Sequence, residues 1–164
     1  MSQTKGLGGE ATPSVECMTI KYMRQLPKSA NPLVIRTCFE NQAAWETVCG
    51  LIRAPQYFTS DPFYANVELF DAVEFENLTP EDLLECVTDV YPHSFLLVVD
   101  CVTITPPEFP VLVIDLYAER GRNFRAIPSQ IQAIENNLSI ANMDFFEFAD
   151  SVDADGIFRG FPRS

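Results

Sequence analysis

The sequence predicts a single α+β domain in which a mixed, largely antiparallel β-sheet of about five strands packs against four or so helices. Two continuous apolar runs, at residues 95–99 and 111–114, are typical of strands that are buried on both faces of a sheet. The connection at residues 105–110 is rich in proline and too short for a helical crossover, which favours an antiparallel pair. Segments with helical periodicity lie on both sides of these runs without strict alternation, as in α+β domains.

The composition is that of one folded domain rather than of a disordered or membrane-spanning chain. At 164 residues and 47% hydrophobic content, the chain can bury a core, which we place in residues 32–164. Residues 1–31 are expected to be a leader that is flexible in part. One short helix is predicted near its end by the helical spacing of Val15, Met18, Tyr22 and Leu26. Because no apolar run approaches about 20 residues and no secretory signal is evident, we expect a cytoplasmic protein.

The first half of the domain carries two strand signals and two helix signals. Residues 33–37 form a short β-prone run, and a second strand is expected within residues 66–70. Asn41 can cap a helix that ends before Pro55. The apolar face of this helix is predicted to contain Ala44, Trp45, Val48, Leu51 and Ile52. Residues 79–82, Thr-Pro-Glu-Asp, predict another helix start, because they combine a capping hydroxyl, a first-turn proline and acids near the positive end of the helix dipole.

The second half of the domain predicts one internal strand, two helices and a closing strand. An arginine- and glycine-containing turn leads into a strand at residues 123–127. Ser129 and Gln132 have the spacing of a capping box that opens a helix, and Asn142 can cap the next helix. The inward face of that last helix is predicted to be Phe145, Phe148, Ala149 and Val152. Residues 157–161 are expected to form an edge strand.

The cysteines predict free thiols. They are odd in number and widely spaced, at Cys17, Cys38, Cys49, Cys86 and Cys101. No C-x-x-C pair indicates zinc binding or thiol exchange. We therefore expect small buried thiols in a reducing compartment. One reactive thiol is left open, because the sequence does not reveal a thiol pKa.

The net charge of −12 resides in the domain rather than in the leader. Residues 1–32 carry four Lys or Arg and two acids, whereas the remaining residues carry 7 arginines against 21 acids. Phosphate binding needs a basic surface, so this balance argues against nucleic acid and anionic membranes as partners. A basic protein partner and simple solubility both remain compatible with the charge.

The C-terminal segment contains the strongest candidate for a binding surface. Asp150, Asp153 and Asp155 belong to an acidic ridge interleaved with phenylalanines, and Phe146 falls outside the apolar face of its helix. An exposed aromatic ring among acids suits an arginine-bearing partner, whereas a second packing layer would bury the ring. We favour a small soluble, non-enzymatic interaction module that binds a basic protein partner through this acidic–aromatic surface. Self-association into a homo-oligomer is left open.

The alternative function is a small-molecule-binding or hydrolase-like enzyme with His93 at a pocket. His93 is the only histidine and precedes a buried strand, although a hydrogen-bonded structural histidine is the simpler interpretation. Arg36 or Arg125 could pair with Glu135, next to Asn136, and organise a polar pocket; the same residues could instead serve architecture and helix ends. No residue is assigned a catalytic role.

A calcium site is the second alternative and the weakest one. Ser151, Asp153 and Asp155 occupy the first, third and fifth positions of half an EF-hand loop, with Gly156 next in line. The position of the bidentate glutamate falls on Pro162, and aspartate turns after a helix are the simpler explanation of the segment. With no phosphate loop, dinucleotide fingerprint or set of metal ligands, the sequence predicts no cofactor and no metal.

Four segments, Arg36-Thr37, Ala43-Ala44-Trp45, His93-Ser94-Phe95 and residues 135–161, carry a resemblance to a known family. Together they resemble an uncharacterised domain-of-unknown-function family, found mainly in bacteria, over about residues 32–161. The resemblance is most specific in E-N-N-L-S-I-A-N-M-D-F and D-A-D-G-I-F-R-G-F. Cys38 departs from it, because the family pattern implies an acidic residue after Arg-Thr. The family has no assigned function, so the resemblance implies no chemistry.

Overall fold

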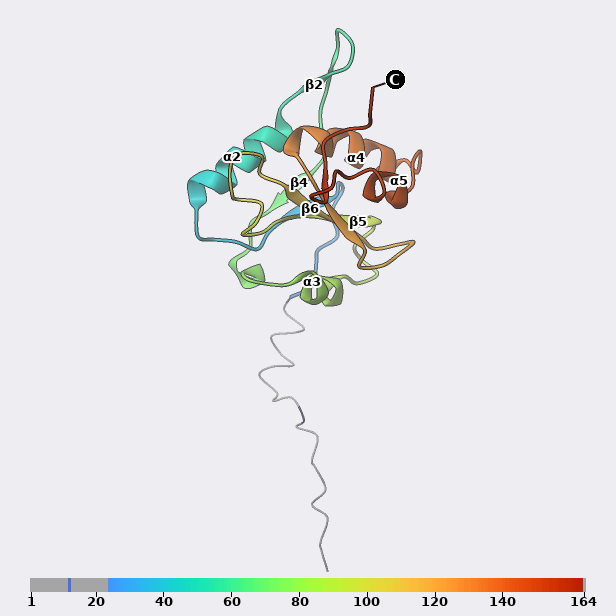
Figure 1. Cartoon of the computed structure of the whole chain (residues 1–164). Coiled ribbons are helices and arrows are strands. Elements are labelled where there is room, and N and C mark those ends of the chain that lie inside the picture. The colour runs from blue at the N-terminus through green and yellow to red at the C-terminus, as the bar shows by residue number, and fades with distance from the viewer. Residues whose placement is uncertain (1–11, 13–23, 164) are drawn as a thin grey trace, which may run out of the picture.

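The centre of the molecule is an antiparallel pair of strands, β5 (Phe95–Val99) and β6 (Val111–Asp115), in which every residue is buried. The computed structural model describes residue 12 and residues 24–163, and Figure 1 shows their arrangement. The antiparallel pairing predicted from the short proline-bearing connection is confirmed. Apolar side chains on both faces of these strands require cover from both sides, and this requirement determines the rest of the architecture.

Further strands extend this pair to a six-stranded sheet in the order β4-β1-β5-β6-β7-β8. β1 (Leu33–Arg36) pairs in parallel with β5 and with β4 (Glu68–Phe70), and β8 (Ile157–Phe158) pairs in parallel with β7 (Asn123–Ala126). The α+β class and the mixed sheet are confirmed. Of the five described pairings in this sheet, three are parallel and two are antiparallel, so the parallel share is larger than expected. Long connections that contain helices return the chain to the same end of the sheet and so permit parallel pairing.

Helices cover both faces of the sheet (Figure 1). In the described residues, α2 (Gln42–Arg53), α4 (Ile131–Ser139) and α5 (Phe145–Ala149) lie on one face, and α3 (Pro80–Cys86) lies on the other. Successive residues of a strand point to opposite faces, so the sheet divides the interior into two cores. One core therefore packs beneath three helices, and the other packs beneath a single short helix.

β5 shows how one strand supplies both cores. Leu97 belongs to the core that contains Trp45 of α2, while its neighbour Leu96 belongs to the core that contains Leu83 of α3. The continuous apolar sequence of β5 is thus explained by burial on both faces, as predicted.

Capping residues begin α2 and α3 where the sequence predicted. Asn41 Oδ1 accepts a hydrogen bond from the backbone N–H of Ala44 at 2.9 Å. Thr79 and Asp82 form a capping box at the start of α3. The buried face of α2 differs from the prediction at Leu51, which is 41% exposed because it lies at the margin of the apolar arc.

The last two helices begin differently from the prediction. A 3₁₀ turn at Pro128–Gln130 precedes α4, so the capping box expected from Ser129 and Gln132 is wrong. α5 follows Asp144 rather than Asn142. In both cases a local turn satisfies the backbone first, which delays the start of the helix by one or two residues. The predicted inward face of α5 is nevertheless buried at its phenylalanines.

Two elements are absent from the sequence-based prediction. β2 (Gln56–Tyr57) and β3 (Pro62–Phe63) form a separate antiparallel hairpin, which rises above α2 in Figure 1. A 3₁₀ helix at Val73–Phe75 follows β4 and places Phe75 in the core next to α3. Both elements are too short to leave a periodic pattern in the sequence.

The chain already belongs to the packed body before residue 32. Leu26 is fully buried, and its backbone N–H donates to the carbonyl oxygen of Cys86 at 2.9 Å. The remainder of the helix predicted around Val15, Met18 and Tyr22 lies outside the described residues. Within the described residues, no helix has the length and apolar character needed to cross a membrane.

Candidate functional sites at the two ends of the sheet

The strands place the predicted site residues at opposite ends of the sheet. β1 and β5 run in the same direction, so Arg36 and Asp100 lie at their carboxyl ends, whereas His93 precedes the amino end of β5. A strand of five residues spans about 17 Å, at about 3.3 Å per residue. A single polar pocket that contains both His93 and Arg36 is therefore excluded.

Arg36 is an anchor inside the carboxyl end of the sheet rather than a free binding group. The residue is 3% exposed, and its Nε donates to the carbonyl oxygen of Cys38 at 3.1 Å. Nη1 donates to Gln42 Oε1 at 2.8 Å and forms an ion pair with Asp71 at 3.2 Å. The guanidinium also lies 4.3 Å from the centroid of the Phe39 ring. These contacts tie β1 to α2 and to the segment after β4.

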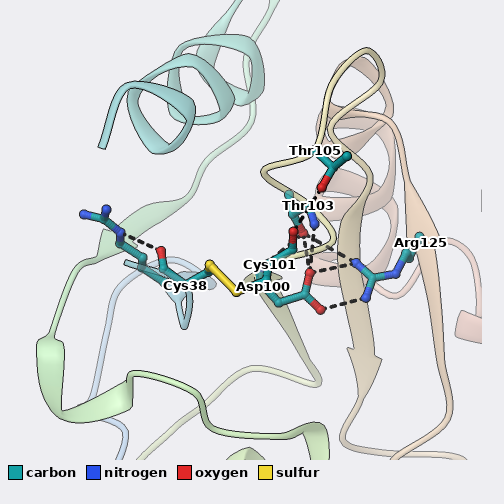
Figure 2. Close-up of a disulfide and its surroundings, with 7 residues drawn as sticks. Cys38, Asp100, Cys101, Thr103, Thr105 and Arg125 are labelled. Atoms are coloured by element: carbon teal, nitrogen blue, oxygen red, sulfur yellow. Dashed lines mark hydrogen bonds and ion pairs between the residues drawn. A yellow bond between two sulfur atoms is a disulfide. The ribbon is translucent and has the colours of Figure 1, made fainter. Parts of the chain in front are cut away.

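A disulfide joins Cys38 to Cys101 across the carboxyl ends of β1 and β5 (Figure 2). The expectation of free thiols is wrong for this pair. Arg36 lies opposite Val99 in the parallel register, so two residues further along each chain Cys38 comes opposite Cys101. Their Cα atoms are 5.1 Å apart, within the usual disulfide range of about 4.4–6.8 Å. The two cysteines meet because β1 and β5 are neighbouring strands. A sequence separation of 63 residues does not reveal that the strands are neighbours.

Asp100 and Arg125 form a two-pronged ion pair beside the disulfide (Figure 2). Arg125 Nη1 and Nη2 donate to the two carboxylate oxygens at 2.9 and 2.7 Å, and Thr103 donates from its backbone N–H and from its hydroxyl at 2.9 Å each. Burial acts to raise the pKa of Asp100, but the hydrogen bonds from Arg125 and Thr103 outweigh it and hold this pKa below its ordinary value. Arg125 also donates to the Pro110 carbonyl at 3.1 Å, so it fastens the loop between β5 and β6.

Glu135 is a buried structural carboxylate on α4. It is 3% exposed, and its two oxygens accept hydrogen bonds of 2.9 Å from the backbone N–H of Asn66 and the hydroxyl of Ser139. The predicted pairing with Arg36 or Arg125 is wrong, because both arginines bind aspartates at the carboxyl ends of the strands. Glu135 instead fastens the segment before β4 to α4.

His93 lies at the amino end of β5 with one ring nitrogen already engaged. Nε2 lies 3.1 Å from the carbonyl oxygen of Ser29, which only accepts, so Nε2 donates. The ring meets Tyr91 edge-on at a centroid distance of 5.1 Å, and a small cavity of about 200 Å³ adjoins it. Within the described residues, no hydrogen bond joins His93 to a hydroxyl or a thiol. Asn136 is exposed on α4 and does not line this cavity. The hydrolase-like function of a pocket at His93 stays a prediction.

The acids predicted to form a free ridge are paired with arginines. Asp150 binds Arg122, and Arg159 binds Asp153 at 2.7 Å and Asp155 at 2.6 Å. The hydrogen bond from Arg159 lowers the pKa of Asp155. The guanidinium of Arg159 therefore takes the place between the two carboxylates that a calcium ion would need in the half-loop.

An apolar cavity of about 300 Å³ opens where α4 and α5 meet the turn after β6. Its lining comes mainly from apolar side chains, namely Tyr117, Ala118, Leu138, Ala141, Met143 and Phe145. Asp144 is the single acid among the lining residues, and Phe146 beside it is 49% exposed. Sequence reasoning singled out Phe146 but not the cavity, because the cavity is built from segments that meet only in the fold.

A family model described as "Domain of unknown function (DUF6924)" matches residues 31–161. The chain belongs to this family. The match confirms the predicted resemblance to an uncharacterised family and brings no activity with it. No curated protein matches the chain. The matched range of the DUF6924 domain contains the disulfide, the apolar cavity and both ends of the sheet.

The DUF6924 domain also displays aromatic residues on the β2–β3 hairpin, which the sequence analysis missed. Tyr57, Phe58, Phe63 and Tyr64 are all exposed, and the rings of Phe58 and Phe63 lie 6.0 Å apart. A usable signal was present, because a Thr-Ser-Asp-Pro turn separates two aromatic pairs. The cavity and the disulfide offered no comparable local signal.

Proposed function

We propose that the DUF6924 domain is a small non-enzymatic interaction module that binds a basic segment of a partner protein. The observation that carries this proposal is the apolar cavity of about 300 Å³, whose lining includes both the exposed ring of Tyr117 and the carboxylate of Asp144. The partner segment would insert one apolar side chain into the cavity and place a neighbouring arginine or lysine against the acids. Aromatic residues and arginine are enriched at such interfaces.

The acids in this proposal lie at the start of α5. Asp144 lines the cavity, and Glu147 follows one turn later. Within residues 24–163, neither carboxylate has a cationic partner. Asp150, Asp153 and Asp155 contribute less to partner binding, because their carboxylate oxygens already bind arginines of the same chain. Among the described acids of the C-terminal ridge, Asp144 and Glu147 are therefore the two whose carboxylates have no arginine partner.

Exposed apolar side chains line the same opening or are next in sequence to residues that line it. Tyr117 lines the cavity and is 84% exposed, and Ile140 and Phe146 adjoin lining residues at 66% and 49% exposure. Single exposed apolar residues are ordinary, whereas a group around a cavity is typical of an interaction site. The volume lies at the lower end of the range for ligand pockets, about 300–1,000 Å³, and suits one large side chain.

Peptide selection tests this proposal without a known partner. Displayed random peptides are selected against the full chain, and a selected peptide is titrated by fluorescence against the wild type and the variant Asp144→Asn/Glu147→Gln. We expect selected peptides to carry an apolar residue next to Arg or Lys. We expect the variant to bind about tenfold more weakly, since each exposed ion pair contributes about 0.2–1 kcal/mol. Asparagine and glutamine keep the acceptors that cap α5.

Two further variants locate the binding surface. Phe146→Ala is expected to weaken binding of the same peptide, because it removes an exposed ring that follows the lining residue Phe145 on α5. Tyr57→Ser/Phe58→Ser removes comparable aromatic surface from the hairpin and is expected to leave binding unchanged. The proposal is overturned if selected peptides lack basic residues, or if only the hairpin variant loses binding.

The compartment and the self-association expected from the sequence stay predictions. The disulfide between Cys38 and Cys101 weighs against a cytoplasmic location, because reducing compartments keep cysteine pairs as thiols. Alkylation of free thiols in intact cells before lysis distinguishes a reducing compartment from an oxidising one: Cys38 and Cys101 are alkylated in the first and protected by the disulfide in the second.

A further inference from the structure

Three groups of the metal-ligand type meet at the carboxyl ends of β1 and β5. Cys38 Sγ, Cys101 Sγ and a carboxylate oxygen of Glu40 all lie within 4.8 Å of one another. Cys38 is buried, whereas Cys101 and Glu40 are exposed to solvent. We propose that the reduced chain binds one thiolate-preferring divalent cation, such as Zn²⁺, through these three groups, and that formation of the disulfide releases the cation.

The direction of the chain after β1 brings the carboxylate to the sulfurs. Phe39 turns toward Arg36, with 4.3 Å between its ring centroid and the guanidinium, while its neighbours Cys38 and Glu40 both face Cys101. Such alternation is that of extended backbone, in which side chains two residues apart share a side. The parallel register of β1 and β5 supplies Cys101 opposite Cys38 (Figure 2).

Glu40 supplies the carboxylate of this cluster, and among the described residues it is free to bind a cation. Asp71 accepts hydrogen bonds from Arg36, and Asp100 accepts them from Arg125. In the described part of the chain, the carboxylate of Glu40 has neither a hydrogen bond nor an ion pair. An unpaired carboxylate beside two cysteines is what a cation with sulfur and oxygen ligands requires.

The donor set fits a zinc site that keeps one position open. Zinc binds cysteine sulfur at about 2.3 Å and carboxylate oxygen at about 2.0–2.2 Å, and sites with three protein ligands hold a water or another molecule in the fourth position. Tetrahedral geometry then places the two sulfurs about 3.8 Å apart. This separation lies within the 4.8 Å cluster, so opening the disulfide and rotating the side chains suffices.

An external thiol reagent supplies or removes the electrons that convert the disulfide form into the zinc-binding dithiol form and back. A dithiol gives two electrons and two protons to the bond between Cys38 and Cys101, which leaves two thiols on the protein and a disulfide on the reductant. Binding of Zn²⁺ then releases both thiol protons to the solvent. In the reverse direction, a small-molecule disulfide accepts two electrons from the two thiolates and leaves as two thiolates, the protein disulfide forms, and Zn²⁺ is freed.

The other described cysteines are poor competitors for the cation. Burial raises the pKa of Cys49 to about 11 and also raises the pKa of Cys86. Zinc binds the thiolate, so these two side chains are held in the unfavourable protonation state.

Metal titration of the full chain tests the proposal. The chain is reduced with a phosphine and freed of reductant without oxygen, and Zn²⁺ is titrated in competition with a chromogenic chelator. We expect the reduced chain to take up a single equivalent and the oxidised chain to take up none. Co²⁺ in place of Zn²⁺ is expected to give the absorption of a cobalt–thiolate bond. Glu40→Gln is expected to weaken binding at least about tenfold while leaving the disulfide intact.

Matched variants separate this site from other ligands. The variant Cys17→Ser/Cys49→Ser/Cys86→Ser and the variant Glu81→Gln are expected to bind like the wild type, whereas Cys38→Ser is expected to lose binding. Glu40→Gln decides the outcome even if Cys38→Ser folds poorly. The proposal is overturned if the oxidised chain binds Zn²⁺ as well as the reduced chain does, or if Glu40→Gln keeps the wild-type affinity for Zn²⁺. It is also overturned if the variant that lacks the three other cysteines no longer takes up Zn²⁺.

Discussion

Asp100 is the side chain on which the carboxyl end of the sheet depends most directly. Its carboxylate receives donors from Arg125 and Thr103 while a quarter of the side chain remains exposed, at 25%. A part-buried network of this kind stabilises when every member is satisfied, and losing one charged member leaves the others unpaired. Asp100 and Arg125 therefore hold the loop that presents Cys101.

Asp100→Asn is expected to lower the free energy of unfolding by about 1–3 kcal/mol near neutral pH, because hydrogen bonds to charged groups are worth about that much. Urea unfolding followed by circular dichroism measures the change. Asp89→Asn, which removes an exposed acid, is the matched control and is expected to have little effect.

The effect of Asp100→Asn is expected to depend on pH. The pKa of Asp100 is lowered in the folded state, so its contribution is fully present above the unfolded value of about 3.9 and is lost as the pH falls through the folded-state pKa. The difference between wild type and variant is therefore constant well above the unfolded-state pKa of about 3.9 and shrinks as the pH falls below it. A difference that stays constant in strong acid would contradict this assignment.

At the scale of elements, α3 is the part of the structure that local signals specify best. Its start has a reciprocal capping box between Thr79 and Asp82, with Pro80 in the first turn. The hydrogen bonds from Thr79 lower the pKa of Asp82. α3 is short, yet it is the single α-helix described on its face of the sheet, so its start matters to the core around Leu83.

Thr79→Ala is expected to lower the free energy of unfolding by about 1 kcal/mol, the usual cost of removing a capping hydroxyl. Chemical denaturation gives the value, and the melting temperature is expected to fall with it. Thr79→Ser keeps the hydroxyl and is expected to remain close to the wild type. Equal destabilisation by both variants would mean that the methyl group, not the cap, stabilises α3.

At the scale of the whole molecule, the disulfide closes a chain segment of 63 residues that contains α2, the hairpin, β4, α3 and β5. A cross-link of this span restricts the unfolded chain more than the folded one, in which β1 and β5 are already paired. The disulfide consequently stabilises the domain without being needed to bring the strands together.

Reduction of the disulfide is expected to lower the free energy of unfolding by about 2–4 kcal/mol. The measurement is guanidinium unfolding of the full chain with and without a phosphine reductant, in the presence of a metal chelator. Cys38→Ser/Cys101→Ser is expected to match the reduced wild type and to be insensitive to the reductant. If the unfolding midpoint of the wild type were the same with and without the reductant, Cys38 and Cys101 would not be joined by a disulfide.

How far the sequence could be interpreted depended on the range of each interaction. The apolar run of β5, the cap at Asn41 and the capping box at Thr79 are confirmed, because each depends on residues within a few positions of one another. The parallel pairing of β1 with β5, and with it the bond from Cys38 to Cys101, depends on strand neighbours that no local pattern encodes.

By itself, the sequence determined the α+β class, the buried central strands, the net charge of −12 and the capped starts of α2 and α3. Only the tertiary structure decided which acids are paired with arginines, which cysteines are bonded and where a cavity opens between α4, α5 and the turn after β6. The physical reason is that charge pairing, disulfide geometry and cavities depend on distances of a few ångströms between segments far apart in the chain. Local periodicity and capping report on neighbours in sequence, and the sites of this protein are made by neighbours in space.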